Sequence, residues 1–61
     1  MRLVNEHGRP VLPGETIYDF RGDSHIFEGG IKPKHSGSTG RVCTDQGEFY
    51  PSVFNMKWEQ E

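Results

Sequence analysis

Glycine and proline interrupt this chain at short intervals, which limits the length of any regular element. The sequence has 61 residues, eight of them glycine and four proline. Proline removes a backbone donor and fixes φ, and a glycine inside a helix costs about 0.5–1 kcal/mol relative to alanine. Alanine, the best helix former, is missing altogether. The spacing therefore predicts short strands joined by tight turns rather than long helices.

The runs between these breakers favour strands. They are rich in Ile, Val, Phe, Tyr and Thr, which are enriched in β-strands. Turn-forming residues bound the runs, for example at 21–23 and at the "DQGE" stretch of 45–48. The segment 31–40, with Pro33 and several small residues, is expected to be a loop. The predicted strands cover residues 15–20, 24–30, 41–45 and 48–50.

The closing segment carries several of the largest apolar residues. After Pro51 there is room for one tight 3₁₀ turn over 51–54. Residues 54–59 then alternate between apolar and polar, which predicts a half-buried last strand. Its inward face would carry Phe54, Met56 and Trp58, and burying each of these fully contributes about 1.5–3 kcal/mol. We expect this strand to close the structure and to fill its core.

A chain of this length forms one small domain. Residues 1–13 contain two apolar pairs, Leu3-Val4 and Val11-Leu12, separated by a turn-forming glycine, which predicts a hairpin. Pro10 and Pro13 each lack a ladder donor and equally suit an extended arm or an edge. We therefore separate an N-terminal arm or hairpin, 1–13, from the body of the domain, 14–61.

The predicted order of elements is similar to that of an SH3-like β-barrel. "TIYDF", Thr16 to Phe20, resembles the first-strand motif of Src-homology-3 domains, alanine-leucine-tyrosine-aspartate followed by phenylalanine or tyrosine. "GEFYPSVFNMKW", from Gly47, resembles the closing segment of that family, and "HSGSTGRV", from His35, resembles a strand entry in KOW and Tudor-type barrels. The small size and unusual composition also resemble those of phage-encoded proteins. The resemblance implies an all-β, SH3-like barrel of about five short strands with a 3₁₀ turn before the last strand.

Src-homology-3 domains bind peptides in a groove lined by aromatic residues. By resemblance, the protein-binding residues of this chain are Tyr18, Pro51 and Phe54. The family also uses a tryptophan that follows a long first loop, whereas Trp58 lies in the predicted last strand and the first loop is reduced to about 21–23. These departures argue against the binding of proline-rich peptides. The resemblance therefore bears on the fold more than on the ligand.

A second reading of the sequence concerns nucleic acid. Residues 29–44 contain no acidic side chain, and the part between 32 and 41 carries Lys32, Lys34, His35 and Arg41. Lysine and arginine supply most of the affinity for a phosphate backbone, and exposed aromatic rings can stack on bases. The formal net charge of −2 and the seven aromatic residues of so small a chain favour a protein partner or self-association instead. A nucleic-acid-binding barrel is the alternative.

The sequence offers no motif for catalysis, a metal or a cofactor. The candidate soft ligands, His7, His25, His35 and Cys43, match no zinc spacing, and "SGSTG" lacks the lysine of a phosphate-binding loop. No apolar run approaches the ~20 residues that cross a bilayer. A free cysteine without a secretion signal suits a reducing cytoplasm. We therefore expect a non-enzymatic, cytoplasmic binding or regulatory module with no catalytic residues, no metal, no cofactor and no membrane partner.

Overall fold

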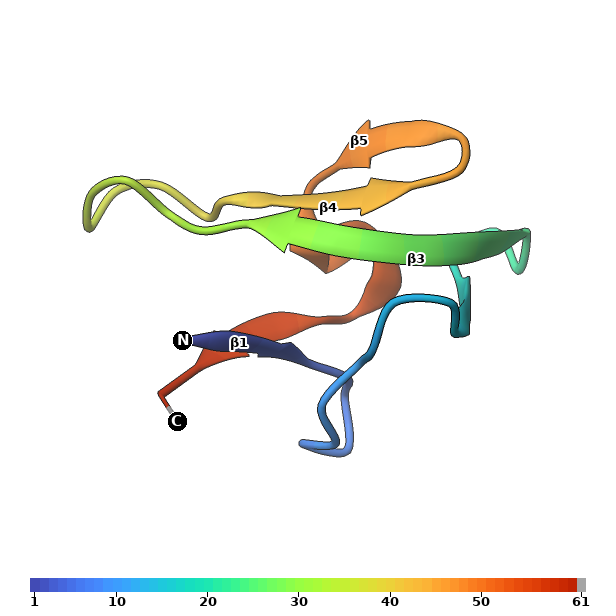
Figure 1. Cartoon of the computed structure of the whole chain (residues 1–61), viewed down its shortest axis with the longest axis horizontal. Coiled ribbons are helices and arrows are strands. Elements are labelled where there is room, and N and C mark those ends of the chain that lie inside the picture. The colour runs from blue at the N-terminus through green and yellow to red at the C-terminus, as the bar shows by residue number, and fades with distance from the viewer. Residues whose placement is uncertain (61) are drawn as a thin grey trace.

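The computed structural model describes residues 1–60 and shows an all-β chain, as predicted. Within these residues there is no α-helix. The strands form a four-stranded antiparallel sheet, β2-β3-β4-β5, and a separate antiparallel pair, β1-β6 (Figure 1). The elements are β1 (Arg2–Val4), β2 (Thr16–Tyr18), β3 (Ser24–Ile31), β4 (Arg41–Thr44), β5 (Gly47–Phe49), the 3₁₀ helix η1 (Pro51–Phe54) and β6 (Lys57–Glu59).

The two sheets enclose one small core, but across residues 1–60 they are not closed into a barrel. Six short strands form where about five were expected, because a segment at the start of the chain pairs with the last strand. The core takes side chains from both sheets and from the segments between them. Its buried apolar residues are Leu3, Val4, Val11, Phe27, Val42, Phe54 and Met56.

β3 is the longest strand and joins the two halves of the four-stranded sheet. It pairs with β2 near its start and with β4 from Phe27 onward, and its register shifts between Phe27 and Gly29. After this bulge, Gly30 faces the β1-β6 pair: a Cβ on Gly30 would lie 2.6 Å from Leu3 Cδ1 and 3.1 Å from the Trp58 ring. The missing side chain therefore allows the two sheets to approach each other closely.

The last strand begins later than the sequence suggests. Phe54 ends η1, and Asn55 then takes a left-handed conformation with φ 56° and ψ 35°. Because this residue turns the chain out of the 3₁₀ helix, β6 starts only at Lys57, and the strand predicted over 54–59 is wrong in its first half. The predicted alternation of burial holds, since Phe54 and Met56 are buried and Trp58 packs against the core.

Residues 1–13 contribute a strand, a turn and part of the core. β1 pairs with β6, with Leu3 opposite Trp58. Val4 then bridges to Pro10, and the Val11 N–H donates to the Leu3 carbonyl at 3.1 Å. The segment thus folds back on itself as a tight hairpin-like turn, and its first strand, β1, also pairs with the last strand, β6.

Candidate binding surfaces

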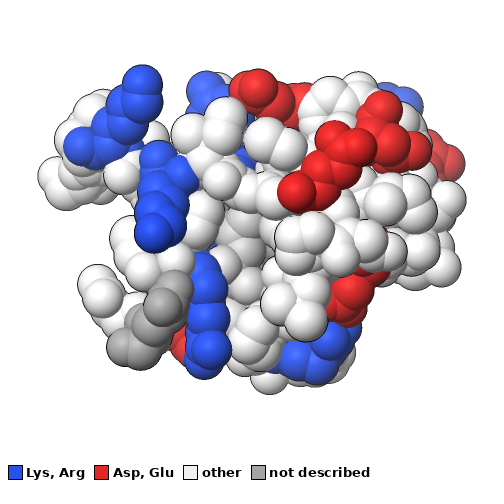
Figure 2. All heavy atoms as spheres, in the orientation of Figure 1, with Lys and Arg blue, Asp and Glu red and all other residues white. Residues whose placement is uncertain are grey.

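Basic and acidic side chains concentrate toward different ends of the molecule. The molecule measures 29 × 21 × 18 Å, and this difference runs along its longest axis. On the face that Figure 2 shows, several Lys and Arg side chains lie at the end with the 31–40 loop, and most of the visible Asp and Glu side chains lie toward the opposite end, where a few Lys or Arg side chains also appear. The loop and the β1-β6 pair carry Lys32, Lys34, Arg41, Arg2 and Lys57, and one acidic residue of β6, Glu59, which forms an ion pair with Arg2 at 3.5 Å. A chain that is acidic overall therefore presents one basic end.

The basic residues predicted for nucleic acid are brought close together. Lys32, Lys34 and Arg41 line one open hollow of about 250 Å³ at the base of the loop. The Arg41 guanidinium stacks over the ring of Tyr50 at 4.3 Å, and this ring is 55% exposed. His35 lies apart in a neighbouring hollow, where its Nδ1 accepts a hydrogen bond from a backbone N–H at 3.2 Å. Three of the four predicted residues thus form one surface beside an exposed aromatic ring.

The three residues implied for protein binding do not form one surface. Tyr18 is 62% exposed, whereas Pro51 and Phe54 are buried. Tyr18 and Phe54 border the same groove, about 350 Å³ in volume, between β2 and the turn that includes His7. Pro51 lines a different groove.

That second groove, called here the Trp58 groove, lies between the 33–39 segment and β6 and has a volume of about 340 Å³. Trp58 is held in place because its Nε1–H donates to the Thr39 carbonyl at 2.8 Å. Sequence reasoning missed this groove, and the one local signal for it is a single tryptophan, Trp58, that follows Pro51. The residues that line it are Met1, Pro33, Ser38, Thr39, Pro51, Ser52, Met56, Lys57 and Trp58.

The core of this small fold leaves three of the seven aromatic side chains exposed, in line with the expectation that two or three would surface. Tyr18 and Ile26 share the outer face of β2 and β3, since Tyr18 pairs with Ser24 and Ile26 with Thr16. Phe20, in the turn that follows β2, is 74% exposed. These exposed side chains form an apolar corner of the molecule at an edge strand of the larger sheet.

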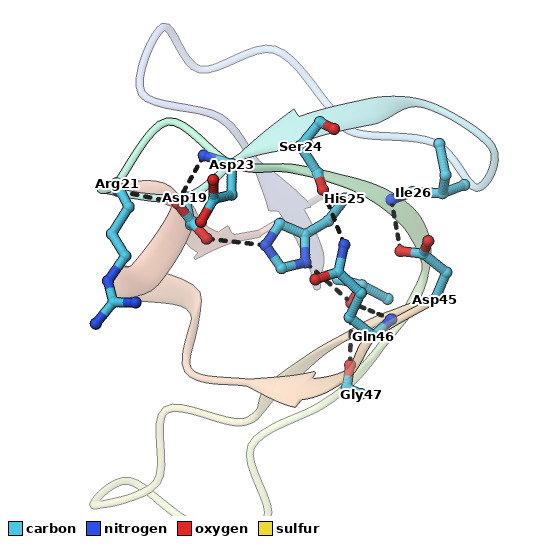
Figure 3. A network of polar contacts seen from close by, with 10 residues as sticks. Asp19, Arg21, Asp23, Ser24, His25, Ile26, Asp45, Gln46 and Gly47 are labelled. Atoms are coloured by element: carbon cyan, nitrogen blue, oxygen red, sulfur yellow. Dashed lines mark hydrogen bonds and ion pairs between the residues drawn. The ribbon is translucent and has the colours of Figure 1, made fainter.

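A buried polar network supports the same corner (Figure 3). His25 is 4% exposed, and its Nε2 lies 2.9 Å from Asp19 Oδ2. Its Nδ1 lies 3.4 Å from the hydroxyl of Thr44, which also bonds to the backbone of Gln46 and Gly47. The hydrogen bond from His25 is the largest effect that lowers the pKa of Asp19. An ionised Asp19 can only accept, so Nε2 of His25 carries the donated proton.

This network resembles a hydroxyl–imidazole–carboxylate array, but its surroundings fit a supporting role. Thr44 is 5% exposed, and the His25 ring packs edge-on against Phe49 at 5.2 Å and Phe54 at 5.0 Å. A nucleophile must reach its substrate, and this hydroxyl is sealed inside the core. Asp19 also accepts hydrogen bonds from two backbone N–H groups of the 19–23 turn. The network therefore fixes this turn to the core.

The network predicts a loss of stability in acid. The pKa of Asp19 is lowered chiefly by His25, and that of Glu15 chiefly by its hydrogen bond from Arg9. A carboxylate whose pKa is lowered by folding stabilises the fold at pH values above its pKa in the unfolded chain, which is about 3.9 for Asp and about 4.3 for Glu. This contribution is lost as the pH falls through the pKa of the folded state. We expect the Tm of Asp19→Asn to lie below that of the wild type at pH 6, and the difference to shrink below about pH 4.

Thermal melts by circular dichroism between pH 2 and pH 6 measure this difference. The same exchange at the exposed Asp23, Asp23→Asn, is the matched control. A gap between wild type and Asp19→Asn that stays constant down to pH 2 would contradict the assignment.

Cys43 and the histidines do not form a metal site. Among residues 1–60, no three of the His, Cys, Asp and Glu side chains are grouped as a metal site requires. Burial raises the pKa of the Cys43 thiol, and the carboxylates of Glu48 and Glu28 raise it further. The thiol is therefore a poor nucleophile at neutral pH.

Comparison with protein-family models, with curated proteins and with solved structures finds no match. In the part of the chain that the structure describes, no helix is long and apolar enough to span a membrane. The function is therefore inferred from the exposed residues and grooves of the molecule itself.

Proposed function

We propose that this chain is a small, non-enzymatic module that binds another protein chain. The observation that supports this most directly is the exposed apolar corner around Tyr18, Phe20 and Ile26, on β2 and β3 and the turn between them. Aromatic side chains supply much of the binding energy of protein interfaces. β2 is also an edge strand, whose unpaired side offers backbone groups to a partner. A cytoplasmic setting would keep Cys43 reduced.

We further propose that the fold is an open relative of the SH3-like barrels. In support, β3, β4 and β5 form a meander, and η1 precedes a last strand that returns to the start of the chain. The "TIYDF" segment pairs with β3, and the strand that pairs with β6 is β1. This placement exposes Tyr18 at a sheet edge instead of bringing it beside Pro51, so the proposed partner is not restricted to proline-rich peptides.

Site-specific photocrosslinking tests the protein-binding proposal. A photoreactive amino acid at position 18 or 26 is expected to capture the same protein, which can be this chain or another. The control is position 12, because Leu12 is 63% exposed but lies outside the apolar corner. Capture must be lost when Phe20 is replaced by serine. Equal capture from positions 12, 18 and 26 would contradict the proposal.

The segregation of charge favours nucleic acid as a second candidate. Lys32, Lys34 and Arg41 line one hollow, and the exposed Tyr50 ring beside Arg41 offers a stacking surface. Phosphate contacts release counterions, so the affinity should fall as salt rises. Three contacts predict a slope of log K against log salt of about −2 for single strands and about −3 for duplex DNA.

Fluorescence anisotropy with labelled single-stranded and duplex oligonucleotides, from 20 to 200 mM salt, would measure this slope. Lys34→Gln should reduce the magnitude of this slope by about 1, because one phosphate contact is lost. Arg9→Gln, at a basic residue away from the loop, should leave the slope unchanged. Absence of binding at 20 mM salt would eliminate this candidate.

A further inference from the structure

Two surfaces at opposite ends of the molecule suit each other as a ring and a slot. The β2–β3 turn presents the exposed Phe20 ring together with the exposed Asp23, and the Trp58 groove presents an apolar slot lined by Lys57, with Lys34 in the adjoining hollow. We propose that copies of this chain associate head to tail, with Phe20 of one copy in the Trp58 groove of the next. This inference rests on the proposed protein-binding function and names the partner as a second copy of the chain.

The turn that would insert is short, rigid and acidic. Phe20 is 74% exposed and Asp23 is exposed as well, whereas the Asp19 side chain is only 12% exposed and its carboxylate lies against His25. Arg21 is the one cation of this turn, and its guanidinium lies 5.9 Å from the centre of the Phe20 ring. The Asp19 carboxylate accepts hydrogen bonds from Arg21 N–H and Asp23 N–H, at 2.8 and 3.0 Å. The turn is therefore organised before binding, which lowers the entropy lost on association.

The groove that would receive the ring is apolar inside and basic at its edges. Pro33, Pro51, Met56 and Trp58 provide its apolar walls, and its volume of about 340 Å³ accommodates a phenylalanine side chain. Lys57 belongs to the groove itself. Lys34 lines the adjoining hollow, which shares Pro33 and Ser38 with the groove.

Charge complementarity favours a second copy as the occupant. The loop end is basic and the turn end is acidic, so two copies that meet end to end attract each other, whereas like ends repel (Figure 2). The β2–β3 turn and the 31–40 loop lie at opposite ends of the long axis (Figure 1). Such a contact joins two different patches, so a pair of copies keeps one free turn, on one copy, and one free groove, on the other. Repetition of the contact would produce a ring or a filament.

Sedimentation velocity on the whole chain, at rising concentration and at 50 and 500 mM NaCl, tests this inference. The wild type should form species larger than dimers, and high salt should weaken them because it screens charge. Phe20→Ser, which removes the inserted ring, should weaken association about tenfold or more. S52E/K57E, at two exposed positions of the groove, should have a similar effect. Leu12→Ser removes an apolar side chain elsewhere that is 63% exposed and should associate as the wild type does.

Mixing the two variants provides the decisive measurement. The Phe20→Ser chain retains an intact groove, and the S52E/K57E chain retains an intact turn, so a mixture should form one-to-one dimers that grow no further. A monomeric wild type at every concentration overturns the inference, as does a dimer that persists in Phe20→Ser. A chain that stays monomeric and binds an oligonucleotide through Lys57, as shown by protection of that lysine in a footprinting experiment, would likewise overturn it. Crosslinking of a different protein through position 18 would then leave the proposed function standing without self-association.

Discussion

Replacing Gly40 by alanine is expected to destabilise the fold by about 2–5 kcal/mol. A domain of this size has a total stability of about 3–9 kcal/mol, at roughly 0.05–0.15 kcal/mol per residue. One methyl group at this position should therefore leave a large share of the chain unfolded at 37 °C. The effect arises from two independent features of the site.

The first feature is the backbone conformation and the second is a close approach. Gly40 has φ +68°, and the left-handed region costs other L-residues roughly 1–2 kcal/mol. A Cβ at this position would also overlap the Ile31 carbonyl oxygen and lie 2.8 Å from Trp58 Nε1. Overpacking of this kind costs typically ~1–3 kcal/mol, and here neither neighbour moves freely. The oxygen belongs to β3, and the indole is tied to Thr39 by its hydrogen bond.

Urea denaturation followed by tryptophan fluorescence would measure this loss, because Trp58 is the only tryptophan. Gly37→Ala, in the same loop, is the matched control: a Cβ there would meet only the His35 ring, at 3.4 Å. Its stability should stay within about 0.5 kcal/mol of the wild type. Equal losses at the two glycines would mean that the Gly40 site is not the constraint described here.

The features that could be predicted from the sequence are those that local rules determine. Strand-favouring residues bounded by turn-forming ones indicated the strands of the larger sheet, and Pro51 indicated the 3₁₀ turn. The burial of Phe54 and Met56 followed from the alternation of apolar and polar residues over 54–59. Each of these inferences depends only on neighbouring residues, for which the sequence contains the whole pattern.

The features that could not be predicted depend on residues far apart in the chain. Leu3 pairs with Trp58, and the Trp58 groove unites Pro33 with Pro51, contacts that no local pattern encodes. The role of His25 in the buried network could not be predicted, because its two partners, Asp19 and Thr44, come from a turn and a different strand. The exposure of Tyr18 likewise follows from which strand β2 joins.

Phe54→Ala is expected to cost about 3–5 kcal/mol, comparable with the entire stability of the domain. Phe54 is 6% exposed, and its ring packs edge-on against His25 at 5.0 Å and Phe49 at 5.6 Å. Truncation removes the apolar area of Phe54 and opens a cavity beside the buried imidazole of His25. Because His25 also holds Asp19, the loss should extend to the turn that presents Phe20.

Phe20→Ala is the matched control, since it makes the same chemical change at a side chain that is 74% exposed. Its free energy of unfolding should change by no more than about 0.5 kcal/mol. Urea denaturation at a protein concentration too low for association would compare the two, and Phe54→Leu provides a milder variant if the alanine chain does not fold. The leucine variant should lose less than the alanine variant but more than Phe20→Ala. If instead Phe54→Leu and Phe20→Ala were equally stable, Phe54 would not anchor the core, and the rigid turn on which the docking proposal depends would lose its support.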